Sequence, residues 1–159
     1  MTRLRCVGVL RAGLRVLAVL SLLGVTCPSR AGLGEAEASV HNDRDRIQGQ
    51  LHREDRHSYR LYAITAPTGA EVREFVGPGG KVFGIAWEGR FHPDLRRLLG
   101  PYFTQAQELY GQQPRLRGAP VRIETPDLVI QESGHMRSFH GRAWLPGLVP
   151  QGVRDGDIR

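Results

Sequence analysis

The chain has 159 residues with 22 basic and 16 acidic side chains, and its formal net charge at pH 7 is +6. Residues 1–31 contain five of the basic residues and none of the acidic ones, so residues 32–159 carry a net charge of only +1. A nearly neutral segment with interleaved charges lacks the basic surface that neutralises phosphates, and we therefore predict no nucleic-acid partner. Its length suits one domain.

The N-terminal segment has the pattern of an export signal. Four arginines precede an uncharged apolar run over residues 16–25, and Pro28 and small residues follow it. The run is too short to span a bilayer, which takes about 20 apolar residues. We predict cleavage after Ala31, because Ser29 and Ala31 place small side chains at the third and first positions before the bond. The prediction is a signal peptide over residues 1–31.

Two alternatives compete with this cleavage. A lipoprotein would be cut before Cys27, but Gly24 stands where a leucine is wanted and Thr26 where a glycine or alanine is preferred. The segment could also stay uncleaved as an anchor. Cleavage after Ala31 removes both cysteines, so the exported domain must be held together by packing without a disulfide. We expect a periplasmic or secreted domain over residues 32–159 with no stable membrane span.

The predicted elements begin after a short arm. Residues 32–39 are small and polar, which indicates a mobile arm. The segment 38–56 places Val40, Ile47 and Leu51 at helical spacing and predicts one helix. Three runs rich in β-branched and aromatic residues follow, separated by turns that contain proline and glycine. These predicted strands cover residues 59–65, 71–76 and 81–87. Their spacing predicts an antiparallel meander.

The second turn, "GPGG" at residues 77–80, precedes a lysine and so resembles a phosphate-binding loop. Such a loop needs a longer glycine pattern, a serine or threonine after the lysine, and a helix that faces the phosphate. Here Val82 follows Lys81 and a strand begins. We therefore predict a hairpin turn in which Gly79 and Gly80 take positive φ angles, and no nucleotide.

The second half of the chain repeats the order of helix and strands. Residues 91–109 carry an apolar stripe at helical spacing, and Gly100 and Pro101 interrupt it, which predicts a kink or two short helices. Strand patterns follow at residues 121–125, 127–133 and 135–145. The whole order predicts a small α+β domain with an antiparallel sheet, built from a three-strand meander plus two or three further strands and two main helices.

Patterns for catalysis or metal binding are weak. His135 and His140 are five residues apart on a predicted strand, so they point to opposite faces and make a poor metal pair. A hydrolase could be assembled from Ser133 or Ser138, His135 and Asp127. No G-x-S-x-G pattern supports it. Glu88 and Asp94 could act as an acid and base on sugars, but paired surface carboxylates are common. We predict no catalytic residue, metal or cofactor.

The strand 136–144 offers the best binding surface. It contains Arg137, His140, Arg142 and Trp144, and such mixtures of guanidinium and aromatic groups are enriched in interfaces. If the strand lies at a sheet edge, it can pair with an extended peptide. The alternative is that Phe139 and Trp144 are core residues and the arginines only solvate the edge.

Several stretches resemble an exported bacterial family labelled domain of unknown function 2844. They are "LGEAEASV", "GAEVREFVGPGGKVFGIAWEGRFHPDLRRLLGPYF", "DLVI" and "GHMRSFHGRAWLPGLVPQGV". One departure is Arg90, where the pattern has a proline. The resemblance implies export and a single small domain, with no assigned reaction. We therefore predict an envelope protein that is a non-enzymatic binding module for a peptide, protein or polysaccharide, with a hydrolase acting on envelope material as the alternative.

Overall fold

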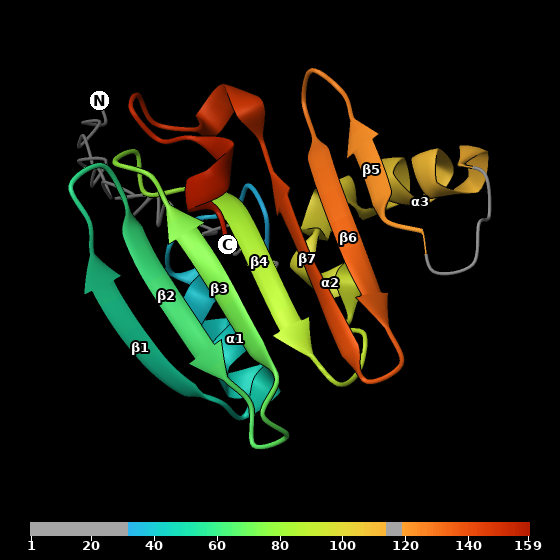
Figure 1. The fold of residues 1–159 in the computed structure, drawn as a ribbon. Helices are drawn as coiled ribbons and strands as arrows, with labels where there is room; N and C mark the ends of the chain where they lie inside the picture. The colour runs from blue at the N-terminus through green and yellow to red at the C-terminus, as the bar shows by residue number, and fades with distance from the viewer. Residues whose placement is uncertain (1–31, 114–118) are drawn as a thin grey trace, which may run out of the picture.

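A computed structural model describes residues 32–113 and 119–159, so the predicted signal peptide lies outside the described residues. The domain is a small α+β fold built on one seven-stranded antiparallel sheet, as predicted (Figure 1). The strand order across the sheet is β1-β2-β3-β4-β7-β6-β5. The strands are β1 Gln50–Asp55, β2 Arg60–Thr65, β3 Glu71–Val76, β4 Val82–Gly89, β5 Val121–Glu124, β6 Val129–His135 and β7 Ser138–Trp144.

The helices are short and lie mostly on one face of the sheet. They are α1 Ser39–Ile47, α2 Leu95–Leu98, the 3₁₀ turn η1 Gly100–Tyr102 and α3 Phe103–Gln112, with two further 3₁₀ turns, η2 Pro146–Leu148 and η3 Asp155–Asp157. The predicted interruption at Gly100 and Pro101 is confirmed, because η1 separates α2 from α3. No helix within the described residues is long and apolar enough to cross a membrane.

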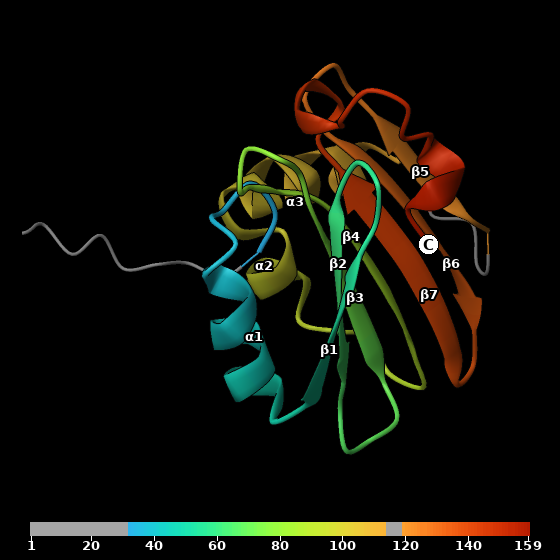
Figure 2. The same ribbon diagram turned by 90° about the vertical axis from the view of Figure 1, so that its left-hand side faces the viewer.

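The sheet has two differently covered faces (Figure 2). α1, α2 and α3 cover one of them, called here the helix face, where the larger apolar core lies. The opposite face, the tail face, is covered in part by residues 146–159, called the C-terminal segment. Its smaller core joins Phe75, Phe83 and Trp144 to Ile158 of that segment. The rest of the tail face stays open.

The predicted meander is confirmed, and its second turn is a hairpin. The Gly80 amide donates to the Gly77 carbonyl at 3.0 Å. Gly80 has a positive φ of 70°, whereas Gly79 does not take a positive φ, so the prediction was right for one glycine and wrong for the other. Lys81 bridges to Ala36 in the sheet and belongs to no helix N-terminus.

The predicted helix over residues 38–56 was wrong in its second half. α1 ends at Ile47, and Gln48 takes a left-handed conformation with φ of 54°. At Gly49 the chain passes so close to β2 that an added Cβ would lie 2.9 Å from the Thr65 carbonyl oxygen. β1 then pairs along the whole of β2. Leu51 therefore belongs to a strand.

The predicted mobile arm was also wrong. Leu33 is fully buried, and the Gly34 amide donates to the Val82 carbonyl at 2.8 Å. The Glu37 carboxylate accepts two hydrogen bonds from Arg60, at 2.7 and 2.8 Å, and one from the Tyr62 hydroxyl. These contacts attach the arm to the sheet, and they lower the pKa of Glu37, chiefly through the bond from Arg60.

Candidate functional site

A row of arginines crosses the tail face. The register places Arg73 of β3 beside Ala86 of β4, and Ala86 beside Arg142 of β7. Arg142 lies beside Gln131 of β6, which in turn lies beside Arg122 of β5. Directly opposed residues of neighbouring strands share one face of a sheet, so three arginines stand in line across five strands. We call these five residues the arginine row.

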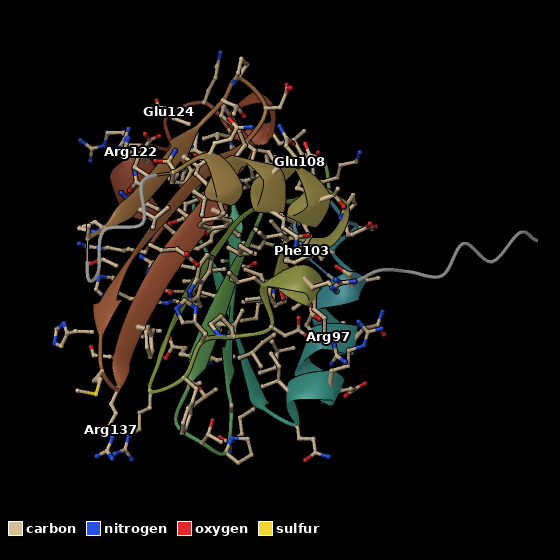
Figure 3. All side chains as sticks on the ribbon, turned by 90° about the vertical axis from the view of Figure 1, so that its right-hand side faces the viewer. Arg97, Phe103, Glu108, Arg122, Glu124 and Arg137 are labelled. Atoms are coloured by element: carbon tan, nitrogen blue, oxygen red, sulfur yellow. The ribbon has the colours of Figure 1, made fainter. Side chains whose placement is uncertain are left out.

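A second row lies beside the first, on the same face. It joins Glu71, Glu88, His140 and Ser133, each next to the following one in the sheet. Apart from Glu71, the residues of the two rows form the floor of a groove of about 520 Å³, a size typical of ligand sites. Figure 3 shows Arg122 and Glu124 on β5, at the edge of the sheet. The groove is therefore built from residues of five strands and has polar and charged side chains on its floor.

Two arginines of the row are paired with carboxylates. Arg73 contacts Glu88 at 3.0 Å and Glu71 at 3.1 Å. Arg122 contacts Glu124 at 2.8 Å, and both of these side chains are about 60 % exposed. An exposed pair of this kind contributes little to stability and can exchange its partner.

The third arginine, Arg142, anchors the C-terminal segment. Its Nε and Nη2 groups donate to the Gln131 Oε1 atom at 2.9 and 2.7 Å. Its Nη1 group donates to the backbone carbonyls of Asp155, at 2.6 Å, and Ile158, at 3.0 Å. The guanidinium also lies 5.3 Å from the centre of the Trp144 ring. Arg142 thus holds the segment whose Ile158 completes the smaller core.

We expect Arg142→Ala to lower the free energy of unfolding by roughly 2–3 kcal/mol, because hydrogen bonds to a charged group are among the stronger ones. Arg137→Ala is the matched control. Arg137 is exposed, and no hydrogen bond or ion pair joins its side chain to the described residues, so its change should be nearly neutral. Urea denaturation measures both. Equal stability of the two variants would contradict the anchoring role.

The structure separates the four predicted binding residues. Arg137 sits in the turn between β6 and β7 with φ of 66°, and its side chain points away from the domain (Figure 3). His140 is exposed and lines the groove, where Arg142 lies beside it. Trp144 is 2 % exposed and packs in the smaller core. β7 lies between β4 and β6, so the sheet edge that pairing with a peptide requires is not present there.

The residues weighed for catalysis are also dispersed. Glu88 lies in the groove, whereas Asp94 lines a smaller cavity between α1 and α2 on the helix face and pairs with Arg97. His135 lies at the end of β6, opposite Ser138. Sequence analysis missed the line of Glu88, His140 and Ser133, because only strand register brings these residues together. Within residues 32–113 and 119–159, no group of three His, Cys, Asp or Glu residues is placed to hold a metal ion.

A pair of buried carboxyl groups lies on the helix face. Glu74 of β3 is fully buried, and Asp43 of α1 is 2 % exposed and within hydrogen-bonding reach of it. Burial raises the pKa of Glu74 well above its ordinary value, and repulsion from Asp43 raises it further. Burial also raises the pKa of Asp43, against the opposing effects of the bond to Glu74 and of Arg46 and Arg97.

Neither Glu74 oxygen has a donor among the other described groups, so the pair is best satisfied when it holds a proton between its two members. The pair lies between α1 and β3, so its protonation state affects the stability of the fold. It is on the opposite face of the sheet from the groove.

Comparisons with known proteins identify the family to which the chain belongs. No curated protein and no solved structure matches the chain. A family model does match, over residues 29–158. This range contains all the described elements of the fold and, except for Arg159, the whole of the groove and the C-terminal segment. The chain belongs to the family described as "Protein of unknown function (DUF2844)".

Proposed function

We propose that this protein is an exported, non-enzymatic binding module of the bacterial cell envelope and that it holds its ligand in the groove on the tail face. The basic and apolar pattern of residues 1–31 supports export. The groove supports binding, because it is an open concave surface with several polar groups directed into one space. This concentration of guanidinium, imidazole and hydroxyl groups carries the proposal.

The alternative, a hydrolase, depends on Glu88, His140 and Ser133. They stand side by side in the order of a catalytic triad. In such a triad the acid orients the histidine, and the histidine activates the serine. No hydrogen bond joins the three side chains, and the Glu88 carboxylate is instead held by Arg73 at 3.0 Å. His140 and Glu88 are also exposed to solvent, where water competes for each contact. This arrangement favours recognition over nucleophilic attack.

Filling the groove should abolish binding. Ser133→Trp places a large ring on the groove floor, whereas Thr104→Trp places the same ring on an exposed position of α3. Calorimetric titration with soluble peptides, neutral polysaccharides and acidic polysaccharides should identify at least one ligand. We expect Ser133→Trp to weaken its binding at least about tenfold and Thr104→Trp to leave it unchanged.

Two outcomes would contradict the proposal. One is that no material in the panel binds, or that Ser133→Trp binds as tightly as the unaltered protein while both variants melt normally. The other is cleavage of a polysaccharide or peptide during incubation, detected by chromatography and lost in His140→Ala. That result would replace the binding module with the hydrolase.

A further inference from the structure

We infer that the ligand of the groove is a carboxylate-bearing polysaccharide, bound across the strands along the arginine row. This inference rests on the proposed function and names its ligand class. The observations that carry it are the neutral partners of Arg142, the spacing of the arginines and the position of β7 inside the sheet.

Arg142 is a cation on the groove floor that pairs with no carboxylate of the described residues. All 16 acidic residues of the chain lie within the described residues. None of them forms an ion pair with Arg142, whose hydrogen bonds go to an amide oxygen and two backbone carbonyls. Neutral acceptors satisfy the donors of a guanidinium but leave its charge in place. Arg142 is half-buried, so solvent screens that charge less completely than at a fully exposed site. The floor therefore attracts an anion.

The groups around Arg142 strengthen this preference. His140 lies two residues away on the same face of β7, and Arg73 and Arg122 stand at the two ends of the arginine row. Glu88 and Glu71 of the second row both contact Arg73 already, at 3.0 and 3.1 Å. A ligand carboxylate can replace Glu124 as the partner of Arg122, because that pair is exposed. An anionic ligand that displaces Glu124 thus gains contacts with the arginines of the row. The displaced carboxylate is exposed, so no buried carboxylate is left without a partner.

The spacing of the row suits a polymer with charges at regular intervals. Arg73 and Arg142 are two strands apart, as are Arg142 and Arg122. Since neighbouring strands are separated by about 4.8 Å, successive arginines of the row start roughly 10 Å apart. In an extended peptide, side chains on the same side recur about every 6.7 Å, which does not match this interval. A charged polysaccharide chain can present acidic groups at wider intervals.

Four of the five strands in the groove also disfavour a peptide, since only β5 has a free edge. β4, β7 and β6 are paired on both sides, so their backbone groups are used within the sheet and cannot add a peptide strand. The large aromatic residue of β7, Trp144, is buried, so it cannot serve on the floor as an aromatic anchor of the kind that peptides and proteins use. The floor offers imidazole, hydroxyl and guanidinium groups, which bind hydroxyls and carboxylates of sugars.

The test is a calorimetric titration of the unaltered protein with three probes of similar length. They are oligogalacturonate, which is an acidic saccharide, dextran oligosaccharide, which is neutral, and oligoglutamate, which is an acidic peptide. We expect oligogalacturonate to bind best and its affinity to fall as salt is added, because exposed charges are screened over about 8 Å at physiological ionic strength. Arg122→Ala should weaken this binding about threefold to tenfold, whereas Arg137→Ala, at the exposed turn outside the groove, should leave it unchanged.

The possible failures are distinguishable. Equal or tighter binding of dextran would overturn the acidic ligand and leave the binding module standing. Tighter binding of oligoglutamate would replace the polysaccharide with an acidic peptide. Equal weakening by Arg122→Ala and Arg137→Ala would show nonspecific attraction and overturn the arginine row as the site. If none of the three probes binds, the inference fails, and the wider panel proposed above then decides whether the groove binds anything.

Discussion

Replacing Gly141 with alanine is expected to lower the free energy of unfolding by roughly 2–3 kcal/mol, because the added methyl group has no room. An ideal Cβ at this position would collide with Trp87 Cζ2 and would lie 2.6 Å from Cε2 and 2.9 Å from Nε1. The Trp87 ring is 2 % exposed and packed in the larger core, so it cannot turn away without moving its neighbours. Urea denaturation of the variant measures the loss.

Gly79→Ala is the matched control for this prediction. Gly79 has no positive φ, and nothing lies within 4 Å of an added Cβ. Its change should be neutral or slightly stabilising, because alanine restricts the unfolded chain. If Gly141→Ala were as stable as Gly79→Ala, the packing of Trp87 against β7 described here would be wrong.

The second large effect concerns the buried carboxyl pair. A group whose pKa is raised in the folded protein binds its proton more tightly there than in the unfolded chain, so stability falls as pH rises. The fall begins near the ordinary glutamate pKa of 4.5 and continues up to the raised pKa of Glu74 in the folded state. Its slope is up to about 1.4 kcal/mol per pH unit for each proton. The Glu37 carboxylate has the opposite effect, since its lowered pKa stabilises the fold above pH 4.5. We expect maximal stability at mildly acidic pH.

Glu74→Gln isolates this effect, because an amide keeps the shape of the side chain and can donate to Asp43 without titrating. Above pH 5, we expect the free energy of unfolding of the variant to decline much less than that of the unaltered protein. At pH 8 the variant should be more stable by roughly 1–3 kcal/mol. Glu88→Gln, at an exposed position, serves as the control and should retain the decline. A flat stability profile of the unaltered protein from pH 5 to pH 9 would contradict the shared proton, as would a Glu74→Gln variant less stable at pH 8.

The fold class could be predicted because local sequence patterns determine where most of its strands and helices form. The strands at residues 60–65, 71–76 and 82–89 are rich in β-branched and aromatic residues and are separated by turns of proline and glycine. The interruption at Pro101 follows from the missing amide hydrogen. β1 was missed because its six residues, QLHRED, have no strong strand preference and are held in place by pairing with β2. Tertiary pairing overrode local preference there.

The site could be predicted only in part, because it depends on register between distant segments. His140 and Arg142, two of the four residues proposed for binding from the sequence, line the groove, and their neighbours come from β3, β4, β5 and β6. No local pattern signals that Arg73 and Arg122 stand in one row. The role of Arg142 depends on the C-terminal segment folding back onto the tail face, which its mixture of proline, glycine and charged residues did not reveal. By contrast, Glu74 shares one face of β3 with Val72 and Val76 and could have been recognised as buried.

The most direct test of the proposed binding site is a map of backbone amide shifts by nuclear magnetic resonance during titration with oligogalacturonate. The account predicts that the shifts concentrate on the two rows of the groove, above all at Arg122, Ser133, His140 and Arg142, while α1 and α3 on the opposite face stay unchanged. Shifts centred on the helix face, or no shifts at saturating ligand, would contradict it.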